Sequence, residues 1–323
     1  MTRNILRRTV LACGVALVAA PALADATYPN KPVTIVVGYP AGGSTDLVGR
    51  MVAHEIEKHL GQTVIVENLG GAGGAIGAQK VANAKADGYT LLVGANNELA
   101  IANLINKAVK YKISDFTPIG MVASQPMVLV ASQKAHVKNT REFIDLVKSK
   151  PGATSYGSSG VGTALHLAGE MMKDQGKIDM QHVPYRGVPA LTNDVLGNNI
   201  EFGVFVLSSG LPLIKSGKVV ALGTTEAKRY AQTPDIPALA EQPEFKNVNI
   251  NSWFSLMGPA HMPAPVVAKI KAALDKSMAS PEFRKKMEDA GAQVMDPKLD
   301  AAKYINTEIG KYKKIVDVAK IEL

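Results

Sequence analysis

The chain has 323 residues, a formal net charge of +8 and a hydrophobic content of 46%. Its basic residues are dispersed and only 5% of the residues are aromatic, which argues against a nucleic-acid-binding protein. The length supports two domains, each with its own core. Cys13 is the only cysteine, so a disulfide framework is excluded.

The first 24 residues have the pattern of a secretory signal peptide. Three arginines precede an apolar run over 9–20, and Ala22-Leu23-Ala24 offers the small residues that a signal peptidase needs. The run is shorter than the roughly 20 residues of a membrane span. A buried N-terminal helix is the alternative. Cleavage after Ala24 would leave 299 residues with a net charge of +5 and no cysteine.

Short apolar runs alternate with amphipathic stretches after the signal peptide. This alternation is typical of a parallel, doubly wound α/β sheet, in which buried strands are continuously apolar. The predicted strands cover 33–37, 64–66 and 89–93, and the predicted helices cover 47–60 and 75–84.

The alternation restarts after Pro126, which predicts a second α/β unit followed by a mostly helical tail. In the second unit, strands are predicted over 127–131, 154–156, 182–184, 201–207 and 219–224, and helices over 140–149, 163–173 and 190–196. In the tail, a strand is predicted over 252–257 and helices over 265–278, 281–290 and 301–319.

No segment matches a catalytic or nucleotide-binding motif. The glycines of 70–77 do not satisfy G-x-G-x-x-G, and 157–161 lacks the last glycine of the G-x-S-x-G nucleophile elbow. His54 and His59 lie about 140° apart around a helix and cannot share a metal ion. We therefore expect no enzyme, no metal site and no cofactor.

Two glycine- and serine-rich loops each lead from a predicted strand into a helix. One spans 40–46 and the other 157–163. The start of a helix has unpaired N–H groups and a partial positive charge, so such a loop can hold a carboxylate without an arginine. One loop of this kind in each unit predicts a clamp for a small anion, at the carboxyl ends of the strands.

Several short motifs follow one another in a fixed order along the chain. They are Tyr28–Val33, Pro40–Asp46, Val66–Asn68, Gly71–Gly74, Ala86–Leu92, Tyr156–Gly160 and Val183–Gly187. With these motifs the chain resembles the Bug receptors, the TctC-type substrate-binding proteins of tripartite tricarboxylate transporters, over nearly all of its length after the signal peptide.

The resemblance implies a two-lobed periplasmic binding fold of type II-like build, with a doubly wound sheet in each lobe and a hinge of two crossing strands. The crossings are expected near 124–131 and 251–258. They would divide the chain into domain I (25–124 plus 251–323) and domain II (125–250).

The implied function is capture of a small carboxylate by lobe closure in the periplasm. The ligand would be an amino acid, a di- or tricarboxylate or an aromatic acid, and a monomeric receptor would pass it to a membrane permease. Reporting the ligand to a sensor kinase is one alternative, and a secreted α/β hydrolase is another.

The two loops, the resemblance and the polar segment after the third strand together nominate the ligand-binding residues. They are Ala41, Gly42, Gly43, Ser44, Thr45, Asp46, Asn96, Asn97, Glu98, Ser158, Ser159, Gly160, Thr163, Arg186 and Phe205.

Several of these residues have a structural alternative. The glycines of 42–43 would permit a tight turn. Asp46 would stabilise its helix by interacting with the positive end of the helix dipole, and the serines of 158–159 would cap a helix. For Arg186 a loop-bracing role is preferred to ligand contact, and for Phe205 a core position is preferred.

Glu98 is unexpected beside an anion site, because its carboxylate would repel the ligand. We expect it either to pair with an amino, amide or hydroxyl group of the ligand or to point into solvent.

Overall fold

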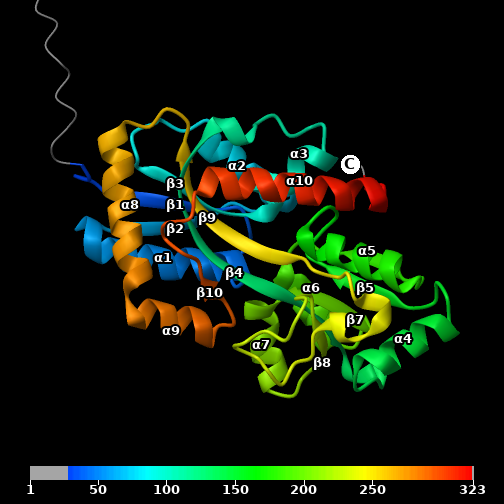
Figure 1. Cartoon of the computed structure of the whole chain (residues 1–323). Coiled ribbons are helices and arrows are strands. Elements are labelled where there is room, and N and C mark those ends of the chain that lie inside the picture. The colour runs from blue at the N-terminus through cyan, green and yellow to red at the C-terminus, as the bar shows by residue number, and fades with distance from the viewer. Residues whose placement is uncertain (1–27, 322–323) are drawn as a thin grey trace, which may run out of the picture.

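The computed structural model describes residues 28–321, so the predicted signal peptide lies outside the described residues. These residues form a two-lobed α/β protein (Figure 1). The strands are β1 (Val33–Val37), β2 (Val64–Asn68), β3 (Thr90–Ala95), β4 (Phe116–Ala131), β5 (Ser155–Ser158), β6 (Gln181–Pro184), β7 (Phe202–Val206), β8 (Val220–Thr224), β9 (Asn251–Pro259) and β10 (Gln293–Val294). The helices are α1 (Ser44–Leu60), α2 (Ala75–Ala82), α3 (Ala102–Ile105), α4 (Thr140–Ser149), α5 (Ala164–Gly176), α6 (Val188–Leu196), α7 (Leu207–Lys215), α8 (Ala264–Ala279), α9 (Pro281–Asp289) and α10 (Ala301–Ala319).

The first sheet has the strand order β2-β1-β3-β9-β4. Its first three strands are parallel, and β9 runs antiparallel to both β3 and β4. β1 and β3 are largely apolar and their central residues are buried, as expected for strands covered by helices, whereas β2 lies at the edge of the sheet and exposes Ile65. Loops that leave β1 and β3 at their carboxyl ends therefore meet at one edge of this sheet.

The second sheet has the order β6-β5-β7-β4-β8, and β4 belongs to both sheets. Residues 116–126 of β4 pair with β9, whereas Met127–Ala131 pair with β7 and β8. One strand thus leaves the first sheet and continues into the second, which makes it the first crossing between the lobes.

The chain crosses back at Ile250–Asn251, next to the first crossing. Thr225 ties the two crossings together: its hydroxyl donates to the Ile250 carbonyl and accepts from the Met127 amide at 2.9 Å. Its own amide donates to the Met127 carbonyl at 2.9 Å. Thr225 is fully buried, so water cannot replace these bonds.

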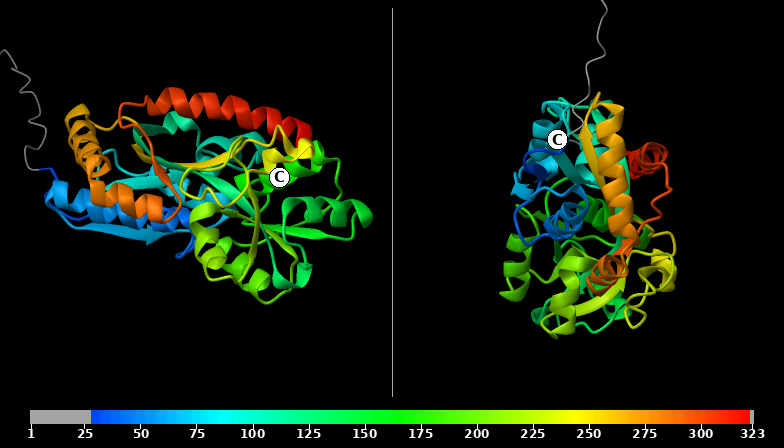
Figure 2. Two further views of the ribbon diagram at one scale, coloured as in Figure 1. Left: turned by 60° about the horizontal axis from the view of Figure 1, so that its bottom comes forward. Right: turned by 90° about the vertical axis from the view of Figure 1, so that its left-hand side faces the viewer.

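Helices cover both sheets, and the last one spans the two lobes. α8 packs on α1 at the far end of the first lobe. α10 lies along one side of the molecule, over α3 in the first lobe and against α5 in the second (Figures 1 and 2).

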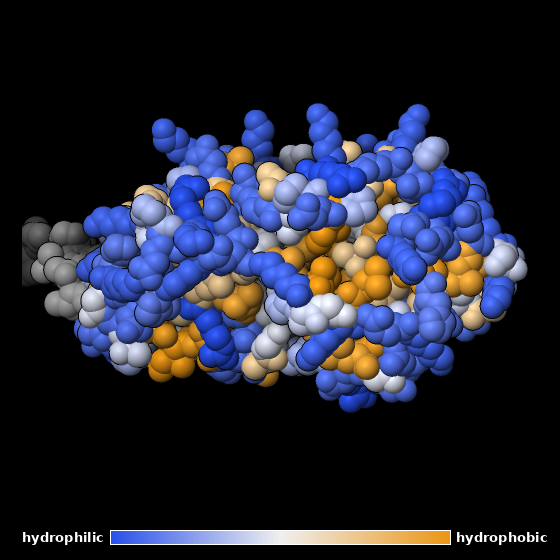
Figure 3. Space-filling view, turned by 90° about the horizontal axis from the view of Figure 1, so that it is seen from below, coloured by the Kyte–Doolittle hydropathy of each residue, from blue (hydrophilic) through white to orange (hydrophobic). Residues whose placement is uncertain are grey.

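Polar side chains cover most of the face seen from below, and apolar ones gather mainly near its middle (Figure 3). Among residues 28–321, none of the helices combines the length and apolar character needed to cross a membrane.

Most predicted elements are confirmed to within a few residues, but one strand was predicted too short and three elements were not predicted: the short α3 and β10, and helix α7. The predicted strand 127–131 is only the last part of β4. The earlier part was not predicted because Pro118, Gly120 and Pro126 are unusual within strands, and register shifts in its pairing with β9 accommodate them. Helix α7 was not predicted at all, since Gly210 and Pro212 are poor helix formers.

We expect Thr225→Val to lower the free energy of unfolding by about 1–3 kcal/mol, because the buried Met127 amide loses its acceptor. Urea denaturation followed by circular dichroism measures this change. Thr63→Val, at an exposed position, is the control. Equal stability of the two variants would show that Thr225 does not hold the crossings together.

Candidate functional site

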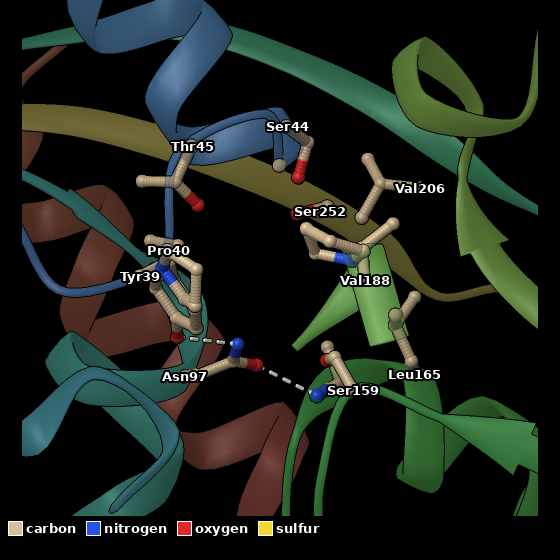
Figure 4. A pocket seen from close by; sticks show the side chains of 14 residues that line it. Tyr39, Pro40, Ser44, Thr45, Asn97, Ser159, Leu165, Val188, Val206 and Ser252 are labelled. Atoms are coloured by element: carbon tan, nitrogen blue, oxygen red, sulfur yellow. Dashed lines mark hydrogen bonds between the residues drawn. The ribbon is translucent and has the colours of Figure 1, made fainter. Parts of the chain in front are cut away.

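A small cavity, called here the inner cavity, lies between the lobes where loops of both meet (Figure 4). Its volume is about 30 Å³, which is room for one or two water molecules. No charged side chain lines it. The lining residues are Tyr39, Pro40, Gly43, Ser44, Thr45, Ala95, Asn97, Ser159, Ala164, Leu165, Val188, Pro189, Val206 and Ser252.

In the first lobe, Asp46 braces the loop between β1 and α1. Its carboxylate accepts hydrogen bonds from the Gly42 amide (2.9 Å), the Arg50 side chain (3.0 Å) and the Asn68 side chain (2.9 Å). Burial alone would raise the pKa of Asp46, but these bonds outweigh burial and hold the pKa below its ordinary value. Gly42 has a φ of 86°, which favours glycine.

Helix α1 begins directly after this loop. Gly43 is its N-cap and provides no capping side chain. The N–H groups of the first turn, next to Ser44 and Thr45 on the cavity wall, are therefore not used by a cap. They provide the positive end of a 17-residue helix to the inner cavity.

In the second lobe, polar side chains shape the loop between β5 and α5 from behind. The Ser158 hydroxyl lies 2.7 Å from Nε2 of His182 and also bonds to Gly160. Thr163 donates to the Gly160 carbonyl at 2.8 Å and caps α5 through the amide of His166. Both hydroxyls bond to groups behind the cavity wall, so they hold the shape of the loop, and Ser159 is the serine that lies on the wall.

Two stacked histidines lie under this loop. The rings of His166 and His182 are 3.8 Å apart and nearly parallel, and Nδ1 of His166 accepts a hydrogen bond from the Gly162 amide at 3.0 Å. Burial lowers the pKa of His166 to about 4 and that of His182 to about 3. Both rings are therefore neutral at pH 7, which lets His166 act as an acceptor.

Asn97 joins the lobes across the cavity. Its carbonyl oxygen accepts from the Ala164 amide, the first N–H of α5, at 2.7 Å, and its amide nitrogen donates to the Tyr39 hydroxyl at 2.7 Å (Figure 4). Asn97 and Tyr39 belong to the first lobe and Ala164 to the second. This side chain thus occupies part of the helix start at which we expected the ligand carboxylate.

Glu98 neither lines the cavity nor points into solvent. Its side chain is fully buried behind Tyr39, where it contacts the hydroxyl at 2.8 Å and accepts from the Ala95 amide at 2.7 Å. Burial raises the pKa of Glu98 to about 7. Both expectations for Glu98 are therefore corrected: the π-turn Asn97–Ile101 directs the carboxyl group into the lobe interior.

A larger space, called the outer cavity, continues from the inner one and has a volume of about 780 Å³. The two cavities share Tyr39, Pro40, Asn97 and Ser159 as a common wall. Arg186 lines the outer cavity and is exposed, and no described residue forms an ion pair with it. Between 28 and 321, no group of three His, Cys, Asp or Glu could hold a metal ion.

Seven nominated residues lie on these walls: Gly43, Ser44, Thr45, Asn97, Ser159, Gly160 and Arg186. The other eight do not: Ala41, Gly42, Asp46, Asn96, Glu98, Ser158, Thr163 and Phe205. Asn96 is buried and donates to Tyr312 and to the carbonyl of Asn251, and Phe205 is buried in the core of the second lobe. Ala41 and Gly42 are exposed in the loop, and the remaining four brace loops or turns from behind.

The apolar and aromatic residues of the inner cavity wall were not predicted from the sequence. Tyr39, Leu165, Val188 and Val206 line the inner cavity from four separate segments, and the unpredicted Ser252 adds a hydroxyl from β9. Val206 is the last residue of β7, so the rule that ligands lie beyond strand ends could have suggested Val206. The others depend on how the lobes meet, which no local pattern reveals.

Comparison with known proteins agrees with this architecture. The family model described as "Tripartite tricarboxylate transporter family receptor" (TctC) matches residues 48–321. The structure is similar to that of Rpa4515 of R. palustris with adipate (TM-score 0.88, 27% identity, 92% of this chain and 99% of that chain). It is also similar to MatC of Rhodopseudomonas palustris with bound malate (TM-score 0.83, 28% identity, 90% and 100%). BugT of Bordetella pertussis is 32% identical over 267 residues, 81% of each chain.

A site between two lobes is the architecture of solute-binding proteins, and the family that the chain matches is one of periplasmic receptors rather than enzymes. The chain belongs to the TctC family of tripartite tricarboxylate transporter receptors.

The separate tasks of the two serines can be tested. We expect Ser158→Ala to destabilise the fold by about 1–2 kcal/mol, since the half-buried His182 and Gly160 lose a partner, and Ser159→Ala to change stability by less than about 0.5 kcal/mol. Chemical unfolding gives both values. A larger loss for Ser159→Ala would reverse the assignment.

Proposed function

We propose that this protein captures a small carboxylate between its lobes in the periplasm and delivers it to the membrane subunits of a tripartite tricarboxylate transporter. The lobes are proposed to be 25–124 plus 251–323 and 125–250, and export is proposed to depend on residues 1–24. The observation that carries the proposal is that the inner cavity is closed jointly by the starts of α1 and α5, one from each lobe.

The cavity suits an anion that binds without a cationic partner. Its wall carries the hydroxyls of Ser44, Thr45, Ser159 and Ser252 and the first turn of α1, and no negative side chain. Helix N-termini and hydroxyl donors stabilise a carboxylate in such a site. Arg186 adds a positive charge to the outer cavity, where a second carboxylate of a longer solute would lie.

Capture requires the lobes to move. A volume of about 30 Å³ is too small for a dicarboxylate, so the solute enters only when the wall shared by the two cavities opens. Closure then restores contacts from both lobes, and the solute favours the closed form because only there do both lobes contact it. Solved structures of relatives contain adipate and malate, which supports this class of ligand.

A thermal-shift screen tests the proposal. The panel is malate, succinate, adipate, citrate, glutamate and nicotinate, with adipamide as the uncharged match to adipate. A carboxylate at about a thousandfold its Kd adds about 4 kcal/mol of stability, a shift of several degrees. The proposal fails if no acid stabilises the protein or if adipamide does so as well as adipate.

The bond between Asn97 and α5 makes a second prediction. We expect Asn97→Ala to weaken binding of the best carboxylate about threefold to tenfold, because closure loses one hydrogen bond between the lobes. Calorimetry measures the affinity and small-angle scattering the degree of closure. Asn83→Ala, at an exposed position in the same lobe, is the control. Unchanged affinity and shape for Asn97→Ala would contradict this role.

A further inference from the structure

The Tyr39 hydroxyl is at the centre of three short contacts. It lies 2.6 Å from the Gly73 carbonyl oxygen, 2.8 Å from Oε2 of Glu98 and 2.7 Å from Nδ2 of Asn97. The orientation of the Asn97 amide is fixed, because its oxygen must face the Ala164 amide. Asn97 therefore donates to Tyr39. The contacts of Tyr39 with the Gly73 carbonyl and with Glu98 each still need a proton to be hydrogen bonds.

Counting protons decides the state of Glu98. A tyrosine hydroxyl has one proton, whereas the Gly73 carbonyl and an ionised Glu98 can only accept. An ionised Glu98 would leave one of two close oxygen pairs without a proton. A protonated Glu98 donates to Tyr39, and Tyr39 then donates to Gly73, so each contact contains one proton.

Among the described residues, Tyr39 is the only side chain that bonds to the Glu98 carboxyl group, and its other partners are the backbone of Ala95 and of Glu98 itself. A Cβ on Gly74 would lie 2.7 Å from Oε2 of Glu98, so the turn at 72–74 closes directly over the carboxyl group with backbone alone. From the segment before β4, the Tyr111 hydroxyl donates to the backbone carbonyl of Glu98 at 2.8 Å. The burial that encloses this group also raises its pKa to about 7.

The elements that pack against Glu98 provide no cation. Besides Tyr39 and Tyr111, the buried titratable groups on the described elements that pack against this turn are on α10, and Lys80 on α2 is not buried and pairs with Glu67. Tyr312 bonds to the neighbouring Asn96, and Glu308 is bonded to Trp253. The buried residues of α2 are Ala75, Gly77, Ala78 and Val81, and β3 is apolar. Among the described residues, no lysine, arginine or histidine lies within ion-pair distance of the Glu98 carboxyl group.

We propose that Glu98 is a neutral, protonated positioning residue of the solute site, and that capture of a carboxylate is linked to uptake of a proton by Glu98. This inference rests on the proposed capture of a carboxylate. Glu98 touches Tyr39, which lines the cavity (Figure 4), so an ionised Glu98 would put a negative charge directly behind the wall of an anion site. By linkage, a bound anion must then favour the protonated acid.

The direction of the pH effect follows. Because the pKa of Glu98 is raised, the acid is protonated below about pH 7 and loses its proton above it. While the carboxyl groups of the solute stay ionised, its affinity is therefore constant below the pKa of Glu98 and falls as pH rises through 7, by at most tenfold for each further pH unit. Glu98→Gln imitates the protonated acid: its amide nitrogen donates to Tyr39 and its oxygen accepts from Ala95.

The experiment compares the wild type, Glu98→Gln and Glu67→Gln, which removes the same charge at a less buried site of the same lobe. Infrared difference spectra without solute, at about pH 6, are expected to show a carboxylic-acid C=O band that Glu98→Gln lacks and Glu67→Gln retains. Calorimetry with malate and adipate, near pH 7 and in buffers of different ionisation enthalpy, is expected to show uptake of a fraction of a proton by the wild type and Glu67→Gln. Glu98→Gln should show no uptake and a flat pH profile at the affinity that the wild type has in acid.

The outcomes separate the two proposals. A missing acid band, or equal proton uptake in Glu98→Gln, overturns the role of Glu98. If neither malate nor adipate binds the wild type while other acids of the screen do, the best of those acids replaces them. If no acid binds, the proposed function and the linkage fail together, and the infrared band alone still decides whether Glu98 is protonated.

Discussion

The molecule depends on one strand that belongs to two sheets. β4 pairs with β9 in its first part and with β7 and β8 in its last part, so both lobes share a backbone that no linker interrupts. Neighbouring strands of a sheet keep their hydrogen bonds over a range of twist angles of about 10–35°. In the proposed closure, the lobes would rotate about this strand and keep the pairing that defines each of them. The return crossing at Ile250 is tied to the same point by Thr225, which confines the rotation to one place.

A second principle concerns how polar side chains are used around the inner cavity. Asp46, Ser158 and Thr163 all point away from it and hold loop backbone in place. The groups that face the cavity are hydroxyls, one carboxamide and the starts of helices. Dipoles bind an anion well only if they are already oriented, because reorientation in the complex costs free energy. The bracing side chains supply that orientation, and the two neutral histidines below the second loop contribute to it, His166 through Gly162 and His182 through Ser158.

Much of the fold could be predicted from the sequence, because buried parallel strands and amphipathic helices leave periodic patterns. The β4 strand before residue 127 and helix α7 left no such pattern, since prolines and glycines are tolerated there by register shifts and by tertiary packing. The two loops were also predictable, because glycines between a strand and a helix allow close approach of the backbone to a ligand and hydroxyls there offer hydrogen-bond donors. Which residue of a loop faces the cavity was not predictable: Ser158 and Ser159 are neighbours, and only the bond to His182 separates their roles. Glu98 shows the same limit, because its direction is set by a π-turn rather than by an ordinary helical turn.

The position of α10 has a consequence for the energetics of opening. This helix is close to the C-terminus of the chain, yet it packs on the π-turn in the first lobe and on α5 in the second. Tyr312 on α10 also bonds to the carbonyl of Asn251, where the chain returns to the first sheet. Any rotation that separates the lobes must shear α10 against one of its two neighbours. In the proposed capture cycle, part of the free energy of opening would therefore be set at a helix interface far along the chain from either loop. Substitutions in that interface would shift the balance between open and closed forms without changing the cavity wall.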